Sequence, residues 1–248
     1  MKALILLLSL IMPVNIYATV TASALTTSHS TTDASSYQTA SISPSSDKLI
    51  LIAVYSGHAS ATPSTPTVSG NNLTWTQIAT AFQSFGGCRI RITAFRGFGS
   101  SASAGVVTIE FGGQTQLNAG WSITEFTGVD TTTNNGVVQS ATSSSGGASG
   151  GSTTTLSAFA SSTNATWGSW GRPDDASGTT PGSGFTELGD SVAGDTTQDV
   201  NISSEWKNSA DTGVDVTWSG AQAYTAVAVE INELVYSGGI TFRQRRRQ

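Results

Sequence analysis

Hydrophobic residues in this chain recur at every second position, in short runs separated by polar and glycine-rich stretches. The run CRIRITAFRG alternates through Ile90, Ile92 and Ala94, which is the period of a strand with one face toward a core. The run KLILIAVYS, residues 48–56, is apolar at both phases, so we expect a central strand covered on both faces. A buried helix is the alternative for this run, but its length and its β-branched residues favour a strand.

Runs of the same kind fill the rest of the chain, and none after residue 20 shows the 3.6-residue period of an amphipathic helix. The sequence therefore predicts an all-β fold of antiparallel strands, a β-sandwich of jelly-roll or immunoglobulin-like type with no significant helix. Two stretches, His58–Asn72 and Ser143–Ser152, are predicted to be loops because the first contains two prolines and the second is Ser/Gly low-complexity sequence. The predicted strands are 20–27, 37–43, 48–56, 73–80, 88–97, 105–111 and 118–126, then 137–142, 153–158, 166–171, 185–191, 198–207, 214–218 and 224–232.

Residues 105–130 return in degraded form as TGVDVTWSGAQAYTAVAVEINEL, which ends at Leu234. Matched positions are 116 residues apart at Leu51 and Trp167 and 105 apart at Glu125 and Glu230. A steadily falling offset is what shorter loops between matched strands would produce, so the sequence predicts an internal duplication. Two arrangements stay open: two tandem sandwiches that share an interface, which we favour, or one large sandwich built from both halves.

The chain is predicted to divide into four parts. Residues 1–18 read as a secretory signal, with Lys2 before an apolar run and Ala18 as the cleavage point. That run, about 12 residues, is too short for a membrane span, which needs roughly 20. Residues 19–130 form the first β-sandwich repeat, 131–235 the second, and 236–248 a basic tail; residues 131–136, TTTNNG, are the linker candidate. We expect a secreted protein with no membrane contact in its mature form.

Charge is distributed unevenly along the chain. Residues 20–130 carry five acidic and four basic residues, a net charge of −1, and residues 131–235 carry eleven acidic and two basic, a net charge of −9. The tail adds +4 through Arg243, Arg245, Arg246 and Arg247. With so acidic a body we expect no nucleic-acid binding, and we expect the tail to dock onto the acidic second half of this or a neighbouring subunit. Cys88 is the single cysteine, which excludes an intrachain disulfide.

Candidate catalytic residues are few. A hydrolase of the Ser-His-Asp or Cys-His type needs a histidine oriented by a second group, but His29 and His58 both fall in sequence that reads as exposed loop. The one G-x-S-x-G match, at residues 147–151, falls within the Ser/Gly low-complexity stretch and not in a turn between a predicted strand and a predicted helix. We therefore expect a non-enzymatic protein.

Paired carboxylates are the basis of a third hypothesis, glycoside hydrolysis. Glu110 with Glu125, or Glu205 with Glu230, are candidates because they fall on predicted strands. The recurrence of one acid at matched places in both halves favours a structural role over catalysis.

Metal binding is not expected either. One cysteine and two scattered histidines do not make a zinc site. Calcium is the alternative in the acidic second half, although the aspartates there follow no EF-hand spacing. These aspartates are Asp174, Asp175, Asp190, Asp195 and Asp199.

Trp167 and Trp170 lie in the motif TWGSWGRPDD and are expected on opposite faces of one strand. An outward-facing tryptophan can stack on the apolar face of a sugar, so these two residues are the candidates for a carbohydrate-binding module, the alternative function. Packing in the core is the interpretation that we favour for both.

Glu125 has the strand phase of Trp121 and Ile123, so its carboxylate is expected near an apolar face and needs a partner. Cations occur at matched places in the preceding strands, at Arg96 and Lys207. The sequence therefore predicts structural ion pairs Glu125–Arg96 and Glu230–Lys207.

Three stretches, NNLTWTQIAT, GWSITEFTGVD and GSGFTELGDS, are similar to those of uncharacterised β-sandwich proteins of phage virions and bacterial surfaces. The resemblance covers residues 37–234 and implies a structural, decoration or adhesion role. The leader departs from the phage pattern, because virion proteins assemble in the host cytoplasm. The resulting hypothesis is an extracellular or virion-associated structural or adhesion protein that forms homo-oligomers or assemblies, with a glycan as the alternative partner.

Overall fold

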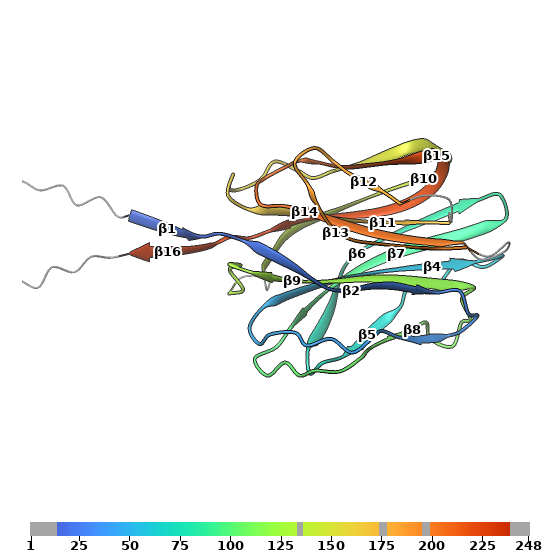
Figure 1. Ribbon diagram of the computed structural model, residues 1–248, viewed down its shortest axis with the longest axis horizontal. Helices are drawn as coiled ribbons and strands as arrows, with labels where there is room; N and C mark the ends of the chain where they lie inside the picture. Colours follow the sequence, from blue (N-terminus) through green and yellow to red (C-terminus); the bar gives the residue numbers. More distant parts are fainter. Residues whose placement is uncertain (1–13, 133–135, 174–177, 195–198, 239–248) are drawn as a thin grey trace, which may run out of the picture.

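The computed structural model describes residues 14–132, 136–173, 178–194 and 199–238. These residues form strands and no α-helix, and every strand pairing is antiparallel, so the predicted all-β, antiparallel sandwich fold is confirmed (Figure 1). In the described part of the chain, no helix is long and apolar enough to cross a membrane.

The first half contributes a five-stranded sheet of order β2-β9-β4-β7-β6 and a three-stranded sheet of order β3-β8-β5. Their bounds are β2 (Thr21–Ser30), β3 (Ser36–Gln38), β4 (Leu49–His58), β5 (Thr67–Gly70), β6 (Thr74–Phe85), β7 (Cys88–Phe98), β8 (Val107–Glu110) and β9 (Asn118–Thr127).

The second half contributes a six-stranded sheet of order β10-β15-β11-β14-β13, with β12 paired to β15. Its strands are β10 (Val137–Thr155), β11 (Ala165–Arg172), β12 (Thr180–Pro181), β13 (Thr186–Ala193), β14 (Val200–Lys207) and β15 (Gly213–Ile231). The last part of β15 pairs with β11 and the start of β10, and its first part pairs with β12 and the end of β10.

The strand order of the two halves is the same. Strands β2, β9, β4, β7 and β6 correspond to β10, the end of β15, β11, β14 and β13. Both halves also shift register by one residue at the same place, at Ile78 in β6 and at Leu188 in β13. Equivalent turns precede these strands, with hydrogen bonds from Leu73 N to Gly70 O and from Phe185 N to Gly182 O. That the second half arose by duplication of the first stays a prediction.

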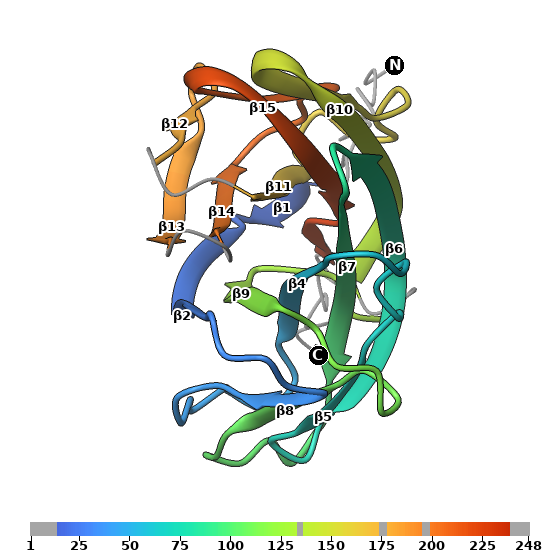
Figure 2. The same cartoon turned by 90° about the vertical axis from the view of Figure 1, so that its right-hand side faces the viewer.

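The sheets stack as layers, which Figure 2 shows edge-on. One cluster of buried side chains lies between the three- and five-stranded sheets and includes Ile50 and Ile109. The central cluster joins the two halves and includes Leu51 and Trp167. A third cluster, which includes Trp170, lies under the first part of β15. Each half thus has its own hydrophobic cluster, and a further cluster is shared between the halves.

Strand β4 is buried on both faces, as its unbroken apolar run predicts. Leu49–Ser56 is buried throughout, with Leu51 in the central cluster and Ile50 in the cluster of the first half. The face-to-face contact is close because glycines occupy it: a Cβ on Gly120 would lie only 2.9 Å from Cγ2 of Ile202.

Several segments differ from the sequence prediction. Ser143–Ser152 is not the flexible loop that its composition predicts, because it belongs to β10 and pairs with β15 through register shifts. β15 is one continuous strand where the sequence predicts two, and β5 lies inside the predicted loop His58–Asn72. In each case a neighbouring strand supplies the backbone hydrogen-bond partners, so pairing decides the structure where side chains provide little signal.

A two-stranded ribbon extends from one end of the stacked sheets (Figure 1). It consists of β1 (Val14–Ala18) and β16 (Leu234–Gly238), paired antiparallel with Ile16 opposite Tyr236 and Ala18 opposite Leu234. β1 therefore falls within the predicted leader, at its end.

Candidate functional site

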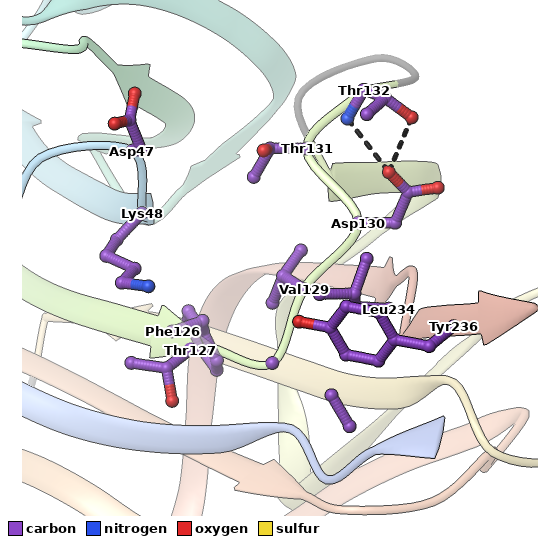
Figure 3. Close-up of a pocket in the computed structure, with 12 residues that line it drawn as sticks. Asp47, Lys48, Phe126, Thr127, Val129, Asp130, Thr131, Thr132, Leu234 and Tyr236 are labelled. Atoms are coloured by element: carbon purple, nitrogen blue, oxygen red, sulfur yellow. Dashed lines mark hydrogen bonds between the residues drawn. The ribbon is translucent and has the colours of Figure 1, made fainter. Parts of the chain in front are cut away.

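A pocket of about 420 Å³ lies at the root of the ribbon, where segments of both halves meet, and it is the candidate site (Figure 3). Its walls come from the turn before β4, the segment after β9 and the start of the ribbon. The lining residues are Ala18, Asp47, Lys48, Phe126, Thr127, Gly128, Val129, Asp130, Thr131, Thr132, Leu234 and Tyr236.

Backbone hydrogen bonds between the ends of the two halves build the floor of this pocket. Leu234 N donates to Gly128 O at 2.9 Å, and Asp130 N donates to Asn232 O at 3.0 Å. Gly128 has a φ of +71°, and a Cβ there would collide with the carbonyl oxygen of Thr19. Only glycine suits this position, which brings the segment after β9 against the start of β2.

The charged groups of the pocket differ in how they are satisfied. Asp130 Oδ1 accepts hydrogen bonds from the backbone N and Oγ1 of Thr132 at 2.9 and 2.6 Å, and its Oδ2 accepts from Asn232 Nδ2 at 3.3 Å. Lys48 extends into the pocket toward Phe126 (Figure 3), and it makes no ion pair with any described residue. The pocket therefore offers a cation, while Asp130 is committed to its own loop.

Apolar and aromatic groups complete the surface. Phe126 and Val129 are buried, and Tyr236 is 56% exposed. The lining contains neither histidine nor cysteine. An apolar floor with a cation, threonine hydroxyls and an exposed phenol ring is suited to binding a polypeptide or a polar small molecule.

The predicted sugar-binding tryptophans lie elsewhere and are inaccessible. Trp167 and Trp170 do face opposite sides of β11, in the central cluster and in the cluster of the second half. Both are 0% exposed, so neither can stack on a sugar. The sequence does not reveal this because a fourth layer, formed by β12 and the first part of β15, covers the face that a single sandwich would leave open.

The strand register does not support the predicted Glu125–Arg96 pair. Glu125 is in register with Ile50, whereas Arg96 is in register with the next residue, Leu51. Their side chains therefore project from opposite faces of the sheet. Glu125 instead accepts hydrogen bonds from the backbone N and Oγ of Ser45 at 2.6 and 3.1 Å.

Glu230 and Lys207 lie on the same face, because both are in register with Thr166. They nevertheless have other partners. Glu230 is fully buried and accepts hydrogen bonds from Gln139 Nε2 at 2.5 Å and Asn164 Nδ2 at 2.6 Å. Lys207 forms an ion pair with Asp211 at 2.7 Å, four residues on. Glu230 is therefore a buried acid whose hydrogen bonds come from amides rather than from a cation, and its structural role stays a prediction.

Glu205 is a buried acid whose surroundings disfavour its charged form. It is 1% exposed, and its Oε2 accepts a hydrogen bond from Gly182 N at 3.0 Å. Burial, with the nearby charges of Asp215, Asp211 and Glu187, raises its pKa to about 8. Its Oε1 has no hydrogen-bond partner among the described residues. The sequence marks Glu205 as one of a carboxylate pair, but it does not reveal that the side chain is buried.

The histidines and the cysteine form no catalytic arrangement in the described part of the chain. His29 Nδ1 bonds to Ser191 Oγ at 2.8 Å, linking β2 to β13, and burial lowers its pKa. His58 Nδ1 accepts from the backbone N of Ser60 and Ala61. Both lie at strand ends and are half-buried, not in exposed loops as predicted. Cys88 packs against the central cluster, and burial raises the pKa of its thiol.

The acidic residues that are candidates for calcium binding are only partly described. Asp174, Asp175 and Asp195 lie outside the described residues. Asp190 Oδ2 accepts from the backbone N and Oγ1 of Thr179 at 2.5 and 3.1 Å. Within the described residues, no three His, Cys, Asp or Glu side chains are placed to hold a metal ion.

Comparison of the chain with protein-family models, with curated proteins and with solved structures found no match.

Proposed function

We propose that this chain is a non-enzymatic, exported structural or adhesion protein that acts through its β-sandwich surfaces and through self-assembly. The observation that carries the proposal is the ribbon. Two-stranded ribbons are marginally stable in water unless something packs on them, yet this one extends beyond the stacked sheets (Figure 1). Its function is expected to be contact with another molecule.

Exposed apolar side chains gather on this ribbon. Six large hydrophobic side chains are exposed in the described structure, and three of them are Tyr17 (48%), Val235 (46%) and Tyr236 (56%) on β1 and β16. In the strand register Tyr17 lies opposite Val235, while Tyr236 is on the other face with Leu234, toward the pocket. Apolar groups on both faces of a projecting element are typical of an interaction site.

Two features of the sequence support the location and the class of function. The leader, residues 1–18, favours export, with a virion-associated role as the alternative. The similarity to β-sandwich proteins of virions and bacterial surfaces favours a structural or adhesion role. Binding of a glycan is the second candidate, and the residue that favours it is Tyr236, whose exposed ring lines the same pocket as Lys48.

Export and assembly can be tested together in a bacterial host. We expect the chain to leave the cytoplasm, and the purified protein to form dimers or larger assemblies in analytical ultracentrifugation as its concentration rises. A chain that stays in the cytoplasm, or one that stays monomeric at every concentration, contradicts the proposal. Specific glycan binding that Tyr236→Ala abolishes and Val138→Ala does not would favour the second candidate; Val138 is the control because it is 41% exposed on β10.

A further inference from the structure

The end of β1 coincides with the predicted end of the leader. β1 covers Val14–Ala18, and the sequence places cleavage after Ala18. β1 is the strand that pairs with β16, through five residue pairs from Val14–Gly238 to Ala18–Leu234. Cleavage after Ala18 would therefore remove the whole partner of β16 and leave the rest of the fold in place.

Strand β16 would then be a free edge held by the body at one end. Its first residue stays anchored, because Leu234 N donates to Gly128 O. Val235 and Tyr236 are already exposed while β1 is present, so removal of β1 adds unpaired backbone groups to exposed apolar side chains. An edge strand of this kind is a template for adding another strand.

We propose that β1 caps β16 in the precursor, and that removal of the leader allows β16 to pair with β16 of a second copy of this chain. The inference rests on the proposed function, because it takes the chain to be exported and processed. The interface would be β16, the partner a second copy of this chain, and removal of the leader the event that controls assembly.

The residue patterns of the two strands identify a second copy as the occupant. β1 reads VNIYA and β16 reads LVYSG, so both have a large residue first, a large residue third and a small residue last. Two β16 strands can pair antiparallel about a two-fold axis at Tyr236. Leu234, Tyr236 and Gly238 of the second copy then take the register positions of Val14, Ile16 and Ala18, which preserves the order of large and small residues along the strand.

The same register brings opposite charges together. β16 of the second copy would run in the direction of β1, toward the body, so its Gly238 would stand where Ala18 stood. The tail of ten residues that follows, with a charge of +4 from its arginines, would then begin at the body of the first copy. Residues 20–235 of that body carry sixteen acidic and six basic residues, a net charge of −10. This complementarity favours a second copy over an unrelated partner.

Two lengths of the chain test the capping step. Residues 1–248 and 19–248 are compared by analytical ultracentrifugation, with circular dichroism to verify that both keep their strands. We expect the longer chain, of 25.4 kDa, to be monomeric and the shorter one to sediment at about twice its own monomer mass. Equal behaviour of the two lengths, whether both monomeric or both dimeric, overturns the proposal.

Cysteine substitutions test the register, in a Cys88→Ser background of the shorter chain. Tyr236 would face Tyr236 of the second copy, with Cβ atoms about 5 Å apart, so Tyr236→Cys should form an intermolecular disulfide. Val235→Cys would face Ser237 and should cross-link far more slowly. Equal cross-linking of the two variants contradicts this register, and failure of both overturns the pairing.

Failure of the β16 pairing can be distinguished from failure of the proposed function. N-terminal sequencing of the exported protein shows whether cleavage follows Ala18. An exported, assembling chain that keeps Val14–Ala18 contradicts this inference and leaves the proposed function intact. A chain that is not exported contradicts the proposed function, while pairing of the 19–248 chain remains measurable by itself.

Discussion

Gly171 of β11 lies directly against the ring of Tyr55 of β4, whose side chain belongs to the cluster shared between the two halves. A Cβ on Gly171 would collide with Cδ2 of that ring, and Tyr55 is fully buried. The two large sheets can therefore approach each other closely here only because one residue has no side chain.

Gly171→Ala is expected to destabilise the protein by about 1–3 kcal/mol, because overpacking a core forces side chains and backbone to shift. The measurement is urea unfolding followed by circular dichroism. Gly213→Ala is the matched control, since the nearest atom to a Cβ at that position, Cγ2 of Thr153, is 3.8 Å away. Equal loss in the two variants would mean that the effect comes from the backbone rather than from the contact with Tyr55.

Stability is expected to fall as pH rises, through Glu205. Its pKa is raised from 4.5 to about 8 by burial and neighbouring acids, so between these values the folded state holds a proton that the unfolded state has lost. The stabilisation is fully present below pH 4.5 and is lost as pH rises toward 8, at about 1.4 kcal/mol for each unit of pKa shift.

Urea unfolding at pH 5, 7 and 9 measures this effect. Glu205→Gln keeps a neutral side chain of similar size at every pH, so its stability should decline less across the same range. If the wild type and Glu205→Gln decline in parallel, Glu205 is not the group responsible.

Glu230 and Glu125, which the sequence matches, are expected to contribute unequally to the stability of the fold. Glu230→Gln adds a third NH₂ group beside those of Gln139 and Asn164, which donate to the carboxylate of the wild type at 2.5 and 2.6 Å. We expect a loss of about 1–3 kcal/mol, because a buried polar group is left without its partner. Glu125→Gln should cost less than about 1 kcal/mol, because the half-buried Glu125 bonds Ser45 near solvent. Thermal melts of both variants make the comparison, and a larger loss at Glu125 would contradict it.

Trp170→Ala is expected to cost about 3–5 kcal/mol, as large core truncations do. The ring is fully buried among Val214, Val216 and neighbouring side chains of the second half. Tyr236→Ala is the control, because a ring that is 56% exposed contributes little to folding. Chemical denaturation should show a much larger loss of stability for Trp170→Ala than for Tyr236→Ala. Unchanged stability of Trp170→Ala would show that this ring is not part of the core.

The candidate pocket illustrates what local sequence does not reveal. Lys48 and Phe126 are terminal residues of predicted strands, but nothing in the sequence says that the turn before β4 and the start of β16 lie together. Leu234 N donates a backbone hydrogen bond to Gly128 O, and the side-chain types in a sequence do not predict such a bond. The predicted ion pair between Glu125 and Arg96 was wrong for a related reason. Alternation along one strand shows which of its residues share a face. It does not show which residues of the next strand share that face until the register between the two strands is known.

The sequence by itself determined the class of fold and most of the strands. Period-two alternation through Ile90 and Ile92, and the unbroken apolar run at Leu49–Ser56, are local consequences of burying one or both faces of a strand. Tertiary structure alone decided which faces became interior. Trp170 is buried because a further layer covers it, and Ser143–Ser152 is a strand because β15 pairs with it. Such long-range pairing depends on backbone groups that every residue carries, so side-chain patterns cannot specify it.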